Sequence, residues 1–267
     1  MTTPATPVVP RPAASVLLVR AGHAAPVEVY MIRRRKSMRF LGGFYAFPGG
    51  KVDPGDAVAD VFARCRGVDG DEAERLFPGA DGVPARAYWV SAARELLEET
   101  GILMARDESG AAIDTSDAGV RLRVTAARQS LMTESAPLSS VLAREGWYLD
   151  LAPLRYLSHF ITPPSSPIRF TARFFLAPVP DGQEPRLYEE EASEGAWIDP
   201  AEGFRRFGQG EMPMAEPAFS GLSYLSAFDS LDVLWAAHAD GRHKFHGIND
   251  RLDALGLRRP RTPAPTS

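Results

Sequence analysis

Residues 85–104 limit what this chain can fold into more than any other segment. Ala, Leu, Glu and Arg dominate here, and neither Gly nor Pro interrupts the run before Gly101. This composition favours an α-helix, and Gly101 stands where a C-terminal cap is expected. Glu95, Glu98 and Glu99 are three and four positions apart, so a helix places their carboxylates on one face. The segment predicts a helix with a dense acidic patch.

An acidic patch of this kind needs a compensating charge. Arg94 precedes Glu98 by four residues, close enough on a helix to offset part of the repulsion and to hold a carboxylate in position. A divalent cation would neutralise the remaining negative charge of the three carboxylates. Clustered carboxylate oxygens suit Mg2+ or Mn2+, which keep waters that a phosphate substrate can displace. The alternative is a solvated acidic face with an ordinary Arg–Glu pair.

The remaining pattern predicts a mixed sheet covered by helices in one domain, because strand-like and helix-like runs interleave without a regular rhythm. Residues 51–84 are rich in Asp, Gly and Pro, and we expect them to form a long, mostly irregular segment between the regular elements. The expected strands are Ala14–Val19, Val27–Ile32, Arg155–Ile161, Arg169–Pro178 and Ala196–Ile198. The expected helices, besides 85–104, are Val58–Arg66, Val120–Leu142 with a break near Pro137, Pro200–Phe207 and Leu222–His238.

Composition excludes several classes of protein. Thirty Lys and Arg against 34 Asp and Glu give a net charge of −4, without the basic excess of a nucleic-acid binder. No apolar run approaches the roughly 18 residues of a membrane helix, and the N-terminus does not resemble a secretory signal. The single cysteine, Cys65, excludes an intramolecular disulfide. We expect a soluble, cytoplasmic protein without nucleic-acid or membrane partners, whose oligomeric state the sequence leaves open.

A specific motif occupies the acidic helix. Residues 94–102 read RELLEETGI and match every fixed position of REUxEExGU, where U is a bulky aliphatic residue. This is the second half of the Nudix box, and the Gly49–Gly50 pair lies upstream of it. The chain therefore resembles the Nudix hydrolases, which cleave diphosphates linked to another group. The resemblance implies an α/β/α sandwich around a mixed sheet, in a Nudix domain at 13–240 with a helical C-terminal extension. The proline-rich composition of the chain ends predicts a disordered leader (1–12) and a disordered tail within the C-terminal extension (241–267).

The resemblance also implies roles for individual residues. Glu98 and Glu99 would bind the catalytic Mg2+ or Mn2+, Glu95 would contribute ligation or proton abstraction, and Arg94 would orient the carboxylates. Tight turning of the backbone beside the metal-bearing helix is expected at Gly49 and Gly50. A late loop of the family can supply one more acidic group, for which the candidates are Glu191 and Glu194.

The first half of the box departs from the family pattern, Gx5Ex7REUxEExGU. Asp56 stands where a glutamate is usual, and residues 57–93 stand where the pattern has seven. The chain thus carries an insertion of about thirty residues inside the box, which could form a lid or a substrate-selecting wall. Two readings of Asp56 stay open: a shorter equivalent of the glutamate, or a loop aspartate.

An element ahead of the box resembles that of the coenzyme A diphosphatase branch. Arg34, Arg39, Gly43 and the FPGG stretch fall on its spacing, although Arg35 replaces a small residue. The implied reaction splits coenzyme A or acyl-coenzyme A into 3',5'-ADP and 4'-phosphopantetheine, with Arg34 and Arg39 holding phosphate through charge-assisted hydrogen bonds. Two alternatives remain: a Nudix hydrolase of ADP-ribose, NADH or nucleotide sugars, and a catalytically silent nucleotide-binding Nudix module.

Overall fold

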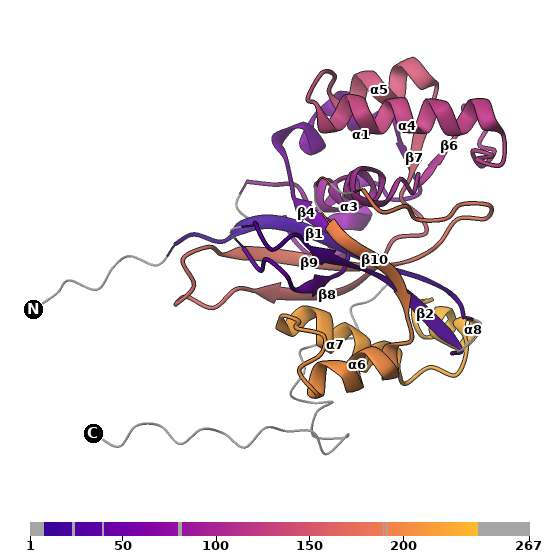
Figure 1. Ribbon diagram of the computed structural model, residues 1–267. Helices are drawn as coiled ribbons and strands as arrows, with labels where there is room; N and C mark the ends of the chain where they lie inside the picture. Colours follow the sequence, from indigo (N-terminus) through magenta and orange to yellow (C-terminus); the bar gives the residue numbers. More distant parts are fainter. Residues whose placement is uncertain are drawn as a thin grey trace, which may run out of the picture.

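The computed structural model describes residues 8–22, 25–38, 40–79, 82–188, 190 and 192–239. A seven-stranded mixed sheet forms its centre, with helices on both faces (Figure 1). The predicted α/β sandwich is thereby confirmed. The strands of this sheet are β1 (Arg11–Ala21), β2 (Val27–Arg34), β3 (Tyr45–Ala46), β4 (Gly49–Lys51), β8 (Arg155–Ile161), β9 (Phe170–Pro178) and β10 (Ala192–Ile198).

The sheet has the strand order β10-β2-β1-β9-β8, with β3 paired to β2 and β4 paired to β1. β1 and β2 form the expected antiparallel pair. β1 and β9 run parallel along nine residues of β1, from Arg11 opposite Phe170 to Val19 opposite Pro178. Strand β1 thus begins inside the stretch expected to be a disordered leader, because Arg11 and Pro12 already have partners in β9.

Helices cover the two faces of the sheet unequally. Below the sheet in Figure 1 lie α6 (Pro200–Gly208), α7 (Glu216–Leu225) and α8 (Leu231–Ala237), and above it lies α3 (Ala85–Thr100). Alternating side chains of β1 separate the two cores, because successive residues of a strand point to opposite faces. Val16 and Leu18 join the core on the α3 side, whereas Leu17 and Val19 join the core on the α7 side.

A further layer covers α3 on its other side (Figure 1). It contains a three-stranded sheet with the order β5-β7-β6, which the sequence analysis did not predict. Its elements are β5 (Cys65–Arg66), β6 (Ala105–Arg106), β7 (Tyr148–Asp150), α1 (Ala59–Phe62), α2 (Gly70–Leu76), α4 (Ala118–Met132) and α5 (Leu138–Glu145). The 57–93 stretch therefore has two parts: residues 57–84 belong to the cover of α3, where β5 pairs with β7, and residues 85–93 form the first half of α3 itself.

Two expected helices are wrong in extent. The helix expected at Val58–Arg66 stops at Phe62, because Cys65 and Arg66 are drawn into β5 beside β7. The helix expected at Leu222–His238 is two helices, since α7 ends at Leu225 and α8 starts only at Leu231, after the N-cap Ser230. The break expected near Pro137 is confirmed between α4 and α5. No helix in the described ranges is long and apolar enough to cross a bilayer.

Candidate active site

Helix α3 carries the acidic motif and is buried along most of its length. Fourteen of its 16 residues are buried, because the large sheet packs on one side and the α4 layer on the other. The helix ends as the sequence predicts: Gly101 adopts a left-handed conformation (φ 72°) and donates its N–H to the Leu97 carbonyl at 3.0 Å. The charged residues of the motif are consequently held inside the protein.

Arg94 is the centre of the charged cluster, with only 6% of its surface exposed. Its Nε donates to Asp56 Oδ1 at 2.8 Å and its Nη2 donates to Asp56 Oδ2 at 3.0 Å, forming a bidentate pair. Its Nη1 donates to Glu98 Oε2 at 2.7 Å and lies 2.9 Å from Glu95 Oε1. Its Nη2 also donates to the Lys51 carbonyl at 2.8 Å. One guanidinium thus fixes three carboxylates and the end of β4.

Strand β4 brings two glycines against the same helix. Glu99 Oε2 accepts a hydrogen bond from the Gly49 N–H at 2.7 Å. A Cβ atom at Gly50 would lie only 2.4 Å from Glu95 Oε1, and Gly49 has a φ of 152° with β1 backbone beneath it. Only glycine fits such close backbone approaches. The predicted Gly49–Gly50 turn therefore lies directly on the carboxylates of α3.

Burial and crowding raise the pKa values of the two carboxylic acids beside Arg94. Burial raises the pKa of Glu95 to about 8; Arg94 opposes this rise, and the neighbouring Glu98 and Asp56 charges add to it. Burial also raises the pKa of Glu98, again against the influence of Arg94. Burial alone would lower the pKa of Arg94, but the same carboxylates together raise it, so Arg94 stays charged. A bound cation would relieve this unfavourable concentration of negative charge.

The donor set fits a hard divalent cation held by few protein ligands. Glu95, Glu98 and Glu99 offer carboxylate oxygens, the donors that Mg2+ and Mn2+ prefer. Within the described part of the chain, no three His, Cys, Asp or Glu side chains converge as a ready-made cage. Arg94 and the Gly49 N–H each hold some of these oxygens instead. The arrangement suits Mg2+, which usually binds one or two carboxylates and fills its other positions with water and phosphate oxygens.

Asp56 joins this cluster from the other side of the 57–93 stretch. It lies in a short 3-10 turn (Pro54–Ala57), is only 1% exposed, and accepts the Asp53 N–H at 2.9 Å besides both Arg94 donors. A solvated loop aspartate would have none of these features. The structure thus brings Asp56 together with Arg94, Glu95 and Glu98.

Other candidate residues lie elsewhere. Arg34, at the end of β2, donates from Nε to the Phe40 carbonyl at 3.3 Å and so closes the base of the following loop. Glu194 accepts from Arg33 Nη1 at 2.7 Å and from the Tyr45 hydroxyl at 2.6 Å. Arg33 alternates with Ile32, which faces α3, so this ion pair lies on the opposite face of the sheet. The structure does not bring Glu194 to the α3 carboxylates. Arg39 and Glu191 lie outside the described residues.

The sequence analysis missed a group at the C-terminal end of α3. Arg128 of α4 is 3% exposed, donates from Nε to the Glu98 carbonyl at 2.6 Å, and lies 3.3 Å from the centre of the Tyr188 ring. Its Nη2 is 3.7 Å from a Glu190 carboxylate oxygen. The acidic run before β10 therefore approaches α3 through Glu190. An arginine one turn from the end of a polar helix gave no signal in the sequence.

Comparison with known proteins assigns the chain to a family. The structure resembles the crystal structure of a Nudix hydrolase from Alicyclobacillus acidocaldarius, with a TM-score of 0.72 and 34% sequence identity over 85% of this chain and 96% of that one. The chain belongs to the Nudix hydrolase family, as the motif on α3 predicts. No profile of a known protein family matches the sequence.

A curated relative is more distant. Nudix hydrolase 7 of Caenorhabditis elegans is 26% identical over 209 residues, which are 77% of this chain. The chain spans only 58% of the length of that relative.

Proposed function

We propose that this protein is a metal-dependent diphosphatase that cleaves the diphosphate of a nucleoside diphosphate linked to another group. The observation that carries the proposal is the α3 cluster: Arg94 fixes Asp56, Glu95 and Glu98 within hydrogen-bonding distance, while Gly49 holds Glu99. A surface acidic patch would not hold its carboxylates buried on a shared guanidinium. Family membership supports the same reading.

Mg2+ or Mn2+ bound by Glu98 and Glu99, with Glu95 as a possible third ligand, would neutralise the diphosphate and lower the pKa of an attacking water. The hydrogen bond from Arg94 Nη1 to Glu98 Oε2, at 2.7 Å, holds this carboxylate in place. The Gly49 N–H fixes Glu99 in the same way. In this proposal Glu95 contributes either metal ligation or proton abstraction.

Asp56 takes the place of the first Nudix glutamate in this proposal. Its carboxylate is bidentate on Arg94, which in turn holds Glu95 and Glu98, so it acts as a positioning residue. The 57–93 stretch is then an insertion inside the box that leaves Asp56 at one end of it and the α3 cluster at the other. Pairing of β5 with β7 makes residues 57–84 of this insertion a fixed wall over α3.

Coenzyme A or acyl-coenzyme A is the proposed substrate, with 3',5'-ADP and 4'-phosphopantetheine as products. Support comes from the sequence element formed by Arg34, Arg39, Gly43 and the residues before Gly50. In this proposal Arg34 and Arg39 hold phosphate oxygens of the substrate.

The first experiment measures turnover of a substrate panel with Mg2+ or Mn2+, identifying products by mass: coenzyme A, acyl-coenzyme A, ADP-ribose, NADH and diadenosine polyphosphates. Release of 3',5'-ADP chiefly from the coenzyme A compounds supports the proposed substrate. Turnover of ADP-ribose or NADH instead would support the proposed metal ligands on α3 but contradict the proposal that Arg34 and Arg39 hold substrate phosphate. Absence of turnover with every compound contradicts the enzymatic proposal and favours a silent binding module.

Glu98→Gln tests the metal site within the same assay. The substitution keeps size and removes the charge, so turnover should fall by at least about a hundredfold while the fold persists. Glu108→Gln is the matched control, because Glu108 is exposed and its carboxylate has no contact among the described residues. Equal rates for wild type and Glu98→Gln would remove Glu98 from the mechanism.

A further inference from the structure

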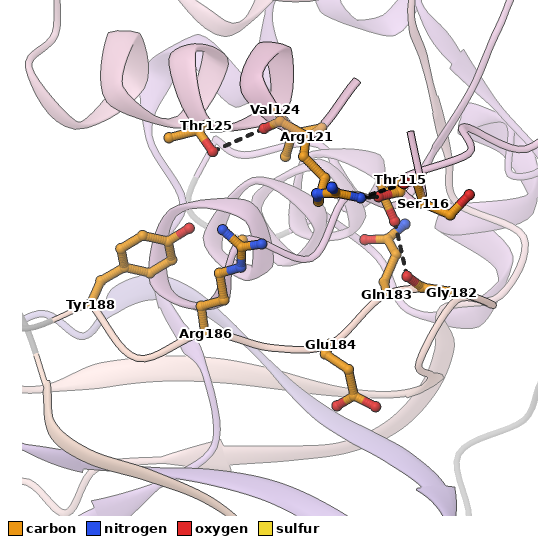
Figure 2. Close-up of a pocket in the computed structure, with 11 residues that line it drawn as sticks. Thr115, Ser116, Arg121, Val124, Thr125, Gly182, Gln183, Glu184, Arg186 and Tyr188 are labelled. Atoms are coloured by element: carbon orange, nitrogen blue, oxygen red, sulfur yellow. Dashed lines mark hydrogen bonds between the residues drawn. The ribbon is translucent and has the colours of Figure 1, made fainter. Parts of the chain in front are cut away.

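A cavity of about 210 Å³ opens beside the C-terminal end of α3 (Figure 2). One wall is the start of α4 with the residues before it, and the other is the 182–188 segment that leads toward β10. Gly101, the cap of α3, lines the cavity, so the cavity lies one helical turn from Glu98. Its polar lining includes Thr115, Ser116, Arg121, Thr125, Arg186 and Tyr188.

The wall formed by the 182–188 segment is fastened to the end of α3. Gln183 is buried and exchanges two hydrogen bonds with the Leu103 backbone, at 2.8 and 2.9 Å. The Arg186 N–H donates to the Thr100 carbonyl at 2.8 Å. The Tyr188 ring is held by the Arg128 guanidinium, 3.3 Å from its centre. The cavity is therefore formed in advance of any ligand and in fixed register with the carboxylate helix.

Two arginines give the cavity a positive character. Figure 2 shows Arg186 rising from the 182–188 segment while Arg121 descends from α4. Nη1 of Arg121 donates to the carbonyls of Thr115 and Ser116, neither of which carries a charge. The Arg186 guanidinium is exposed and has no side-chain or carbonyl partner within the described residues. Within the described part of the chain neither arginine forms an ion pair, although Arg121 lies near enough to the Asp114 carboxylate for an electrostatic interaction.

The acidic residue that lines the cavity points elsewhere. Glu184 projects away from both arginines in Figure 2. Its carboxylate lies 3.4 Å from Arg20 Nη1 and accepts the Trp197 ring N–H at 3.4 Å. The cavity therefore presents two cationic groups to a ligand. Guanidinium groups bind phosphate through charge-assisted, often bidentate hydrogen bonds, so phosphate suits this lining.

We propose that this cavity binds a phosphate group of the substrate that lies outside the scissile diphosphate. The inference rests on the proposed function, since it adds a second phosphate subsite to the same catalytic helix. The phosphate could be a monoester on the ribose, as in coenzyme A, or a further phosphate of a dinucleoside polyphosphate. Arg186 and Arg121 are its specificity-determining residues.

Binding measurements test the subsite without requiring turnover. Calorimetric titrations compare adenosine 3',5'-bisphosphate and adenosine 5'-tetraphosphate with 5'-AMP, on wild type, Arg186→Ala and Arg121→Ala. Each arginine variant loses charge-assisted hydrogen bonds, so its affinity for adenosine 3',5'-bisphosphate or for adenosine 5'-tetraphosphate should fall about tenfold. Its affinity for 5'-AMP should not change. The probe that weakens identifies the source of the phosphate.

The matched control is Arg123→Ala, which removes the same charge from α4. Arg123 pairs with Glu145 at 2.7 Å and does not line the cavity, so binding should not change. Arg186 is exposed and its backbone hydrogen bond survives the substitution, so Arg186→Ala should fold as the wild type does. Unchanged Tm would verify this.

Three results overturn the subsite: failure of both extended probes to bind the wild type, equal affinities for wild type and both arginine variants, or an equal loss for 5'-AMP. These results are independent of the proposed hydrolysis. A protein without turnover that still binds adenosine 3',5'-bisphosphate through Arg186 would keep the subsite and lose the enzymatic proposal. An active enzyme whose affinity for both extended probes is the same with and without the two arginines would keep the enzymatic proposal and lose the subsite.

Discussion

Replacing Asp56 by Asn tests the buried charge network most directly. Asp56 Oδ2 accepts from both Arg94 Nη2 and the Asp53 N–H, while Oδ1 accepts from Arg94 Nε. An amide has only one oxygen, so its NH2 group must face a donor that it cannot satisfy. At 1% exposure no water can substitute. The variant therefore leaves at least one buried donor without an acceptor and removes one of the charges that balance Arg94.

The expected loss follows from the geometry. Breaking a buried ion pair by removing one partner costs about 3–5 kcal/mol. Arg94 keeps Glu95 and Glu98 at 2.9 and 2.7 Å, so the lower end, about 3 kcal/mol, applies. With urea slopes of about 1–3 kcal/mol/M, the unfolding midpoint should fall by roughly 1 to 3 M.

Urea unfolding followed by tryptophan fluorescence measures this loss, with Asp53→Asn as the matched control. Asp53 lies in the same loop, 3.7 Å from Arg94, but its side chain is 60% exposed. Exposed pairs contribute at most about 1 kcal/mol, so the control should stay near the wild type. Midpoints for Asp56→Asn and Asp53→Asn that agree within error would refute the assignment of Asp56 to the Arg94 network.

Three further predictions concern single positions. Gly50→Ala puts a methyl group 2.4 Å from Glu95 Oε1, so metal-dependent turnover in steady-state assays should fall at least about tenfold. Unchanged turnover would show that β4 need not approach Glu95. The Cys65 thiol donates to the Val61 carbonyl, and burial raises its pKa to about 11. Alkylation of Cys65 at pH 7.5 should therefore be at least about 100-fold slower than that of a free thiol. Alkylation at the free-thiol rate would contradict this. Gly101→Ala strains a left-handed helix cap (φ 72°) and puts a methyl group 2.8 Å from the Tyr188 hydroxyl. The free energy of unfolding in urea should therefore fall by about 1–2 kcal/mol. An unchanged unfolding midpoint would disprove this.

Local sequence patterns determined the elements that hold the site. Helix α3 was predictable because good helix formers continue without interruption to a capping glycine. Strands β1, β2 and β9 were predictable because β-prone residues form runs of six or more. The family could be predicted from the resemblance of residues 94–102 to the second half of the Nudix box, which is one continuous motif.

Tertiary structure alone decided which charges meet. Asp56 reaches Arg94 across 38 positions of sequence, a distance over which no periodicity operates. Glu194 faces away from α3 because a register shift between Ala192 and Glu194 sets the face of β10 that it occupies, and a one-residue slip reverses the faces of a strand. A contiguous acidic run cannot reveal such a shift.

The cover of α3 was equally inaccessible to sequence reasoning. β5 and β6 have two residues each, too few to show an alternating pattern, and they form only because β7 lies between them. The cavity beside Gly101 arises in the same way, from α4 and the 182–188 segment meeting at the end of α3. Motif and propensity determined helix α3, because both act within a few residues, whereas long-range packing determined which residues α3 contacts.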